Sequence, residues 1–239
     1  MTETISIDQQ IEALSWLIDR EDKPRLKELL TNPEQIPASI IDHLHQLNVL
    51  NPHGYGRETQ ITNPIINEKW SILREALNEL KPDLNKAKMF VYLGGSLLYG
   101  DPSNDPDYDV VTFSFEDNQD NVDIARNLEY EIYKLDGNVR IVDVVHVNLE
   151  SIQILASQLS KNQFNKLDKM TRMQVHYFGH LANCKAMFVP DSFSQSTPEN
   201  IRQLILTEIF FKVPFLGALL LIDLEKVVKH RNNRRLGLS

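Results

Sequence analysis

The residues best suited to chemistry lie between positions 93 and 111, where glycines, a serine and aspartates follow one another closely. Gly94, Gly95 and Ser96 come directly after an apolar run. Glycine lets the backbone approach a ligand closely, and amides at the start of a helix bind anions. With the Ser96 hydroxyl added, this turn is predicted to form a small phosphate cradle.

Three carboxylates are predicted to accompany the turn. Asp107 and Asp109 enter a second strand-like run, and residues i and i+2 of a strand point to the same face, about 6.6 Å apart. Two such carboxylates can share a pair of divalent cations held roughly 3.5–4 Å apart. Asp143 lies among valines, where a carboxylate is costly unless it is paired or bound to a cation. We therefore expect Asp143 to complete the acidic site.

Strands and a helix must position these groups. The apolar run 89–93 and the β-branched and aromatic run 108–115 are predicted strands, and 139–147 is a third. Between them, apolar residues at positions 124, 128, 132 and 135 predict a helix that stops at Asp136-Gly137. Residues 84–150 are therefore expected to form an α+β core with a small mixed sheet.

The segments on either side are predicted to be mainly helical. Ser6 and Gln9 form a capping box for a first helix, and Pro24 and Pro37 suit the starts of a second and third. With a small hairpin expected over 51–62, residues 1–63 resemble a winged helix-turn-helix domain. Residues 64–83 read as a connector helix, stopped by Lys81-Pro82. Residues 151–239 are expected to be helical, with a clear helix start at 197–199.

The order of the central features resembles the DNA polymerase β-like nucleotidyltransferase superfamily, and within it the small bacterial nucleotidyltransferases. The resemblance covers residues 86–150 and rests on the following elements: Gly94-Gly95-Ser96, Tyr99-Gly100, Asp107-Tyr108-Asp109 and the later Asp143. Residues 185–191 are similar to a late strand of such enzymes. The chain departs from many relatives at position 106, where a proline stands in place of serine.

The resemblance implies a fold and a set of roles. The fold would be a palm-like α+β core, with Gly94, Gly95 and Ser96 holding the phosphates of a nucleoside triphosphate, most simply ATP. Asp107 and Asp109 would ligate two Mg²⁺ ions (Mn²⁺ being an alternative), and Asp143 would ligate one of them and help deprotonate the attacking hydroxyl. A nucleotidyl group would pass to a hydroxyl acceptor, a small molecule or a protein, with release of pyrophosphate.

Cations for the triphosphate are expected from the basic C-terminal third. Residues 84–150 hold five basic and thirteen acidic residues, whereas 151–239 hold twelve and six. Lys166 and Lys169 are the main nucleotide-binding candidates; Lys161, Arg172 and Lys185 are further ones. Each of these is also compatible with an ordinary solvated helix charge.

Composition narrows the function classes. The formal charge of −8 and the pI of about 5.4 make general nucleic-acid binding unfavourable, so DNA binding by the N-terminal segment is the disfavoured alternative. The one cysteine, Cys184, excludes an internal disulfide. His176, His180 and Cys184 are spaced along one helical face, and packed core residues are favoured there over metal ligands. The chain is expected to be cytoplasmic, with no membrane span.

Two functions remain open from the sequence. One is a Mg²⁺-dependent nucleotidyltransferase. The other is a non-catalytic regulator that senses a nucleotide and binds DNA or a partner through its N-terminal domain. The segment 226–235 is basic and is expected to be a frayed, exposed end.

Overall fold

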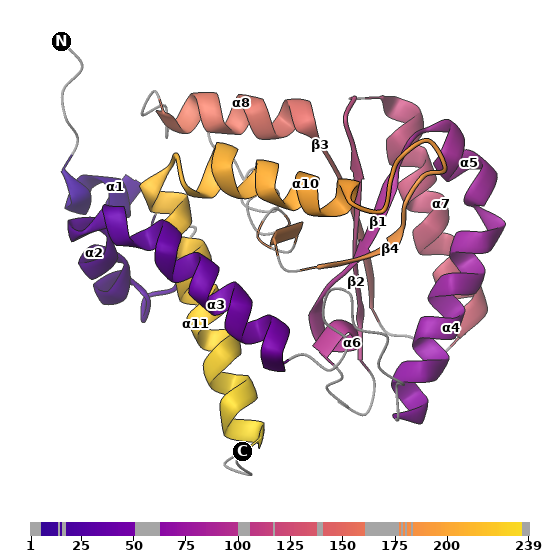
Figure 1. Cartoon of the computed structure of the whole chain (residues 1–239), viewed down its shortest axis with the longest axis horizontal. Helices are drawn as coiled ribbons and strands as arrows, with labels where there is room; N and C mark the ends of the chain where they lie inside the picture. Colours follow the sequence, from indigo (N-terminus) through magenta and orange to yellow (C-terminus); the bar gives the residue numbers. More distant parts are fainter. Residues whose placement is uncertain are drawn as a thin grey trace. The chain divides into compact units, whose positions relative to one another are not determined.

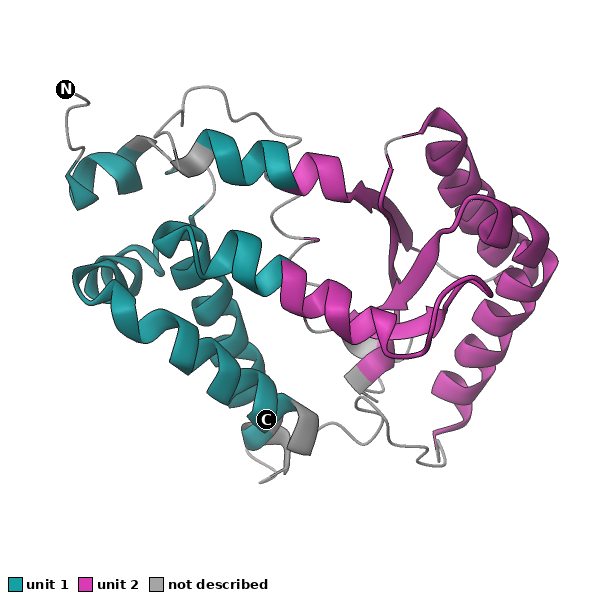
Figure 2. Cartoon of the chain, turned by 45° about the horizontal axis from the view of Figure 1, so that its top comes forward, with its two compact units in different colours: residues 1–50, 153–176, 205–239 teal, residues 51–152, 177–204 magenta. Residues whose placement is uncertain are grey.

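The computed structural model divides the chain into two compact units (Figure 2). Unit 1 comprises residues 1–50, 153–176 and 205–239, and unit 2 comprises 51–152 and 177–204. The described residues are 6–13, 15, 18–50, 63–99, 106–116, 118–137, 141–160, 177, 179, 181–182 and 184–235. The hairpin predicted over 51–62 lies outside them.

Unit 2 is built on a small mixed sheet. Its described strands are β1 (Phe90–Leu93), β2 (Tyr108–Ser114), β3 (Val142–Asn148) and β4 (Lys185–Phe188), in the order β3-β2-β1-β4. β1 is antiparallel to both β2 and β4, and β2 is parallel to β3. Because parallel strands need a long crossover, the helix α7 (Gln119–Asp136) connects β2 to β3. The predicted α+β class with a small mixed sheet is confirmed.

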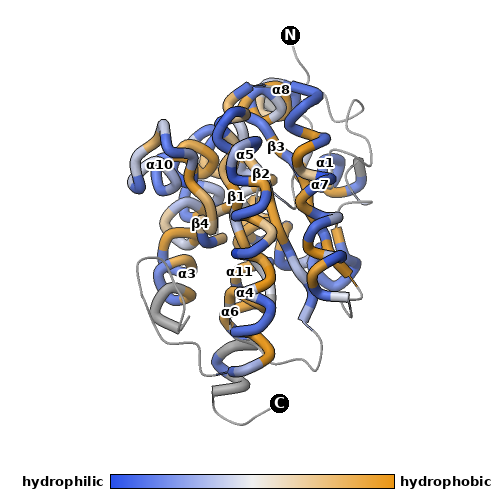
Figure 3. Tube along the Cα trace, turned by 90° about the vertical axis from the view of Figure 1, so that its right-hand side faces the viewer, coloured by the Kyte–Doolittle hydropathy of each residue, from blue (hydrophilic) through white to orange (hydrophobic). Residues whose placement is uncertain are grey.

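Helices α4 (Pro64–Glu79) and α7 cover one face of this sheet (Figure 1). Both begin and end as their sequences predict: the Asn63 side chain accepts hydrogen bonds from the amides of residues 65 and 66, and Gly137 ends α7 with a φ of +59°. The alternation of hydrophilic and hydrophobic residues along both helices can be followed in Figure 3. Their apolar stripes face β1, β2 and β3.

Alternate residues of each strand make up this core. Tyr108 and Val110 of β2 are fully buried in the same cluster as Val91 and Leu93 of β1. The side chains of the residues between them project from the opposite face of the sheet. There Phe90 and Phe113 stand with ring centroids 6.4 Å apart and begin an aromatic group that also includes Tyr92, Phe115 and Phe193. Asp109 and Asp143 occupy the opposite face as well, which places them away from the α4 and α7 core.

Among the described elements, four shorter helices also contribute residues to unit 2. α5 (Lys81–Lys86) follows α4 after a single residue, and α6 (Gly95–Tyr99) follows β1. α8 (Leu149–Ser160) and α10 (Thr197–Ile205) contribute residues to both units. The predicted stop at Lys81-Pro82 is confirmed, and the same proline then serves as an early residue of α5, where its missing amide costs nothing.

Unit 1 joins the two ends of the chain. Its described helices are α1 (Ile7–Ala13), α2 (Lys23–Thr31), a 3-10 turn (Pro33–Gln35), α3 (Ile36–Leu50), a π-helical turn (Leu206–Phe210) and α11 (Pro214–Arg235). α11 packs against α2 and α3. Leu26, Ile36 and Ile40 are almost fully buried. The capping box is confirmed, since the Ser6 amide donates to Gln9 Oε1 and the Gln9 amide donates to Ser6 Oγ.

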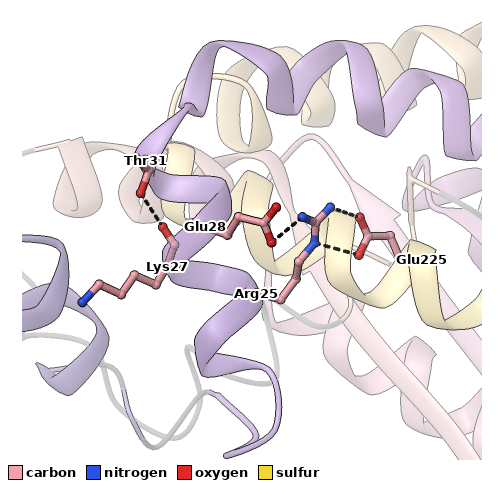
Figure 4. A network of polar contacts seen from close by, with 5 residues as sticks. All are labelled: Arg25, Lys27, Glu28, Thr31 and Glu225. Carbon is pink, nitrogen blue, oxygen red and sulfur yellow. Dashed lines mark hydrogen bonds and ion pairs between the residues drawn. The ribbon is translucent and has the colours of Figure 1, made fainter.

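Ion pairs tie α2 to α11 within unit 1 (Figure 4). Arg25 donates through Nε and Nη2 to the two carboxylate oxygens of Glu225, at 3.2 and 2.6 Å, and its Nη1 lies 2.8 Å from Glu28. These carboxylates raise the pKa of Arg25 above its ordinary value. Lys226 Nζ lies 2.7 Å from Asp22. The fork geometry of Arg25 fixes the register between the two helices.

Two expectations about the C-terminal third need comment. The segment 226–235 is helical and not frayed, because α11 continues to Arg235 and Lys226 is paired with Asp22. Lys226, Lys229 and Asn232 are exposed on it, as predicted. Most residues of 215–222, in the first part of α11, are buried. Among the described residues, no helix is long and apolar enough to cross a membrane.

Candidate active site

The glycine turn lies directly against Asp109. Gly95 opens α6 with a φ of +60°, a conformation that residues with a Cβ rarely adopt. A Cβ built on Gly95 would stand 2.6 Å from Asp109 Cγ and 3.1 Å from Asp109 Cβ. The Gly94 amide donates a 2.8 Å hydrogen bond to the Asp109 carbonyl. The predicted phosphate turn and the predicted carboxylate Asp109 are therefore in contact, and only glycine permits this approach.

Asp109 and Asp143 are neighbours on one face of the sheet. The parallel register of β2 and β3 places Asp109 directly opposite Asp143. Adjacent strands are about 4.8 Å apart, and side chains at opposed positions leave the same face. Both residues are half-buried. The sheet therefore presents two adjacent carboxylates beside the glycine turn.

Tyr177 lies over this pair. Its hydroxyl donates a short hydrogen bond to Asp143 Oδ2, and its side chain is 6% exposed. Burial raises the pKa of Tyr177 above its ordinary value, and the hydrogen bond to Asp143 and the charge of Asp109 raise it further. The phenol is therefore a neutral donor at neutral pH.

Cys184 lies close enough to Asp109 to feel its charge. It is fully buried, and burial raises the pKa of its thiol, with the negative charge of Asp109 adding to the effect and Arg202 opposing it. A thiol in this state is neither a nucleophile nor a metal ligand, because both roles need the thiolate. Cys184 is therefore a buried packing residue near Asp109.

Trp70 and Lys185 fasten the glycine turn from the other side. Trp70 Nε1 donates a 3.1 Å hydrogen bond to the Leu97 carbonyl, which ties α6 to α4. Lys185 Nζ lies 5.1 Å from the centroid of the Trp70 ring, a cation–π contact, and Lys185 pairs with Leu93 at the end of β1. Lys185 therefore lies on the face of the sheet that α4 covers, opposite to the face that carries Asp109 and Asp143.

A buried network holds the start of β2 in place. Tyr108 donates a 2.8 Å hydrogen bond to Asp136 Oδ2, and Lys69 Nζ lies 3.3 Å from the same oxygen. The side chains of Lys69 and Asp136 are 7% and 8% exposed. Lys69 also lies over the Tyr108 ring, 5.0 Å from its centroid. Tyr108 immediately precedes Asp109, so this network anchors the carboxylate from the core side.

The structure brings some of the predicted residues together and not others. Gly94, Gly95, Asp109 and Asp143 form one locus, and Ser96 is the second residue of α6. Asp107 is half-buried and precedes β2. Lys166, Lys169, His176 and His180 lie outside the described residues.

Two of the three predicted carboxylates, Asp109 and Asp143, are placed to hold a magnesium ion. In the part of the chain that the structure describes, no group of three or more His, Cys, Asp or Glu side chains is placed to hold a metal. The predicted trio is therefore not gathered as a three-carboxylate cage. Mg²⁺ in proteins is usually held by one or two carboxylates together with substrate phosphates. The adjacent Asp109 and Asp143 fit that requirement.

Sequence reasoning did not identify Tyr177 or Lys69 as parts of the site. Tyr177 follows the basic segment 161–172 and carries no motif, and its contact with Asp143 spans 34 residues. Lys69 lies on the apolar face of α4, one residue before Trp70, and this position was the available signal. A lysine facing a buried core needs a carboxylate partner.

Comparisons with known proteins add no assignment: no family model, curated protein or solved structure matches the chain.

Proposed function

We propose that the chain is a nucleotidyltransferase of the polymerase β-like type, which moves a nucleotidyl group from a nucleoside triphosphate to a hydroxyl acceptor. One observation carries the proposal: the glycine turn at Gly94-Gly95 lies against Asp109, and Asp109 stands opposite Asp143. A turn suited to phosphate and a pair suited to oxygen-liganded cations therefore share one face of the sheet.

The residues of the site divide the work between them. Gly94 and Gly95 offer close backbone approach to the phosphates. Asp109 and Asp143 would hold Mg²⁺, which stabilises the charge that develops on the attacking and leaving oxygens. Asp143 Oδ2 already accepts a hydroxyl hydrogen bond and is the base candidate for the acceptor proton.

The test is transfer of label from an α-labelled triphosphate. The full chain is incubated with Mg²⁺ and each of the labelled nucleoside triphosphates, alone and with cell extract, and pyrophosphate is measured alongside. We expect label transfer and pyrophosphate release by the wild-type chain. Asp109→Asn and Asp143→Asn should each lower both by about 100-fold or more.

A matched variant separates the effect of removing any carboxylate charge from the effect of removing a carboxylate of the site. Asp42→Asn removes an exposed carboxylate on α3 and should leave transfer unchanged. If the wild-type chain binds a triphosphate but transfers no nucleotidyl group, the proposed enzyme activity is contradicted and a nucleotide-sensing regulator is favoured. Wild-type chain that binds no triphosphate would contradict both.

A further inference from the structure

We propose that Tyr177 is itself a nucleotidyl acceptor, so that the chain modifies its own tyrosine. The inference rests on the proposed function and specifies its acceptor chemistry: a phenolic hydroxyl held within the same chain. Tyr177 and the two carboxylates all belong to unit 2.

The hydroxyl of Tyr177 stands where an acceptor must stand. A general base has to lie within hydrogen-bond reach of the proton that it removes. Tyr177 donates its proton to Asp143 Oδ2, and this carboxylate adjoins Asp109, which touches the glycine turn. The acceptor oxygen, the base and the phosphate turn are thus linked through consecutive contacts.

The burial of Tyr177 favours the reaction within the chain over reaction with a free acceptor. With 6% of the residue exposed, the phenol is held by packing and does not have to be captured from solution. Well-oriented intramolecular groups reach effective concentrations of about 10⁵–10⁸ M. Asp109 and Asp143 are half-buried, so each keeps some exposed surface for a triphosphate while the Tyr177 ring stays packed.

The step balances without a further reactant. Tyr177 Oη attacks the α-phosphorus of the triphosphate, and an oxygen–phosphorus bond forms. The bond from the α-phosphorus to the oxygen bridging to the β-phosphate breaks, and pyrophosphate leaves with that electron pair. The phenolic proton passes to Asp143. The product is a tyrosyl phosphodiester carrying one nucleoside monophosphate.

Mass spectrometry tests the proposal directly. The purified full chain is incubated with each nucleoside triphosphate and Mg²⁺, and the intact mass and tryptic peptides are recorded. We expect a gain of one nucleoside monophosphate, located on the tryptic peptide 173–185, in which Tyr177 is the only tyrosine. The same peptide holds two histidines, so acid stability is checked: a tyrosyl phosphodiester survives acid, whereas a phosphoramidate on histidine does not.

Three variants make the result specific. Tyr177→Phe should lose the added mass while keeping its circular dichroism spectrum and its affinity for the triphosphate. Tyr130→Phe removes an exposed hydroxyl on α7 and should be modified like the wild type. Asp109→Asn mixed with Tyr177→Phe should stay unmodified, because each chain then lacks one half of a reaction that occurs within a chain.

Several outcomes would overturn the proposal and are distinguishable. If the wild type transfers label to another acceptor but never to Tyr177, self-modification fails and the proposed function stands. An acid-labile label, or label on the Asp109→Asn chain in the mixture, contradicts the assignment to Tyr177 within its own chain. If the wild type neither binds a triphosphate nor releases pyrophosphate, both proposals fail.

Discussion

Gly95 lies so close to Asp109 that a single methyl group on Gly95 would collide with the Asp109 carboxylate. A Cβ there would stand 2.6 Å from Asp109 Cγ, and the residue also holds a φ of +60°. The contact joins the end of β1 to the start of β2, two segments that the chain separates by the residues 94–107. It is the contact on which the site is built.

Gly95→Ala should therefore abolish triphosphate binding and nucleotidyl transfer, a larger effect than its loss of folding stability alone would cause. The positive φ alone costs a residue with a Cβ about 1–2 kcal/mol. The clash must in addition displace Asp109 from its place opposite Asp143. We expect triphosphate binding and transfer to be lost, as measured by calorimetry and by label transfer.

Gly137→Ala is the matched control for this change. Gly137 has a φ of +59°, and a Cβ there meets no atom within 4 Å. The variant should lose a similar free energy of unfolding in urea and keep full transfer. Equal functional loss in both variants would show that the backbone strain, and not the contact with Asp109, is responsible.

Lys69→Met should destabilise unit 2 strongly. The change leaves Asp136 buried with its charge uncompensated, and breaking a buried pair in this way costs about 3–5 kcal/mol. Urea unfolding measures the effect. Arg126→Met removes a pair in which the side chains are 71% and 57% exposed, and it should change the free energy of unfolding by less than about 0.5 kcal/mol. A small effect of Lys69→Met would contradict the buried network.

Trp70→Phe should loosen α6. The lost indole donor leaves the Leu97 carbonyl without that hydrogen bond, at a cost of about 1–3 kcal/mol, and triphosphate affinity should fall with it. Lys185→Met keeps the indole bond and removes the cation–π contact, worth about 0.5–1 kcal/mol. We therefore expect the order of unfolding free energies to be wild type, then Lys185→Met, then Trp70→Phe. The reverse order of the two variants would argue against the hydrogen bond as the main tie.

Cys184 should not be alkylated in the folded chain, and in denaturant the chain should take up one alkyl group. Burial raises the pKa of its thiol, so the folded state retains a proton that the unfolded state loses above about pH 8.5. The associated stability is complete below that pH and declines above it, by up to about 1.4 kcal/mol per pH unit. Cys184→Ala should show a weaker decline between pH 8.5 and 10. Identical pH profiles would contradict the shift.

Local signals in the sequence predicted most elements of the described fold. The Ser6 and Gln9 box forms both of its hydrogen bonds, and Gly137 ends α7 in the left-handed region. The strands near 89–93, 108–115 and 139–147 are confirmed, as is the short strand at the start of 185–191. These signals depend on hydrogen bonds and side-chain periodicity within a few residues, which a sequence displays directly.

Long-range contacts were not accessible in the same way. The opposition of Asp109 and Asp143 depends on the register of two strands joined by α7, and the hydrogen bond from Tyr177 depends on a segment 34 residues farther on. Spacing shows that Asp143 needs a partner, because a carboxylate among valines is costly, but it does not say which group provides it. The basic run 226–235 was misread for a similar reason: its partners, such as Asp22, lie 204 residues away.

The union of both chain ends in unit 1 has a consequence for synthesis. α2 and α3 leave the ribosome early, but α11, against which they pack, begins only at Pro214. At about 5–20 residues per second, the apolar faces around Leu26 and Ile40 stay uncovered for roughly 10–30 s after α3 is made. The nascent chain therefore exposes an apolar surface while residues 51–213 are made, and a premature stop before α11 would make that exposure permanent.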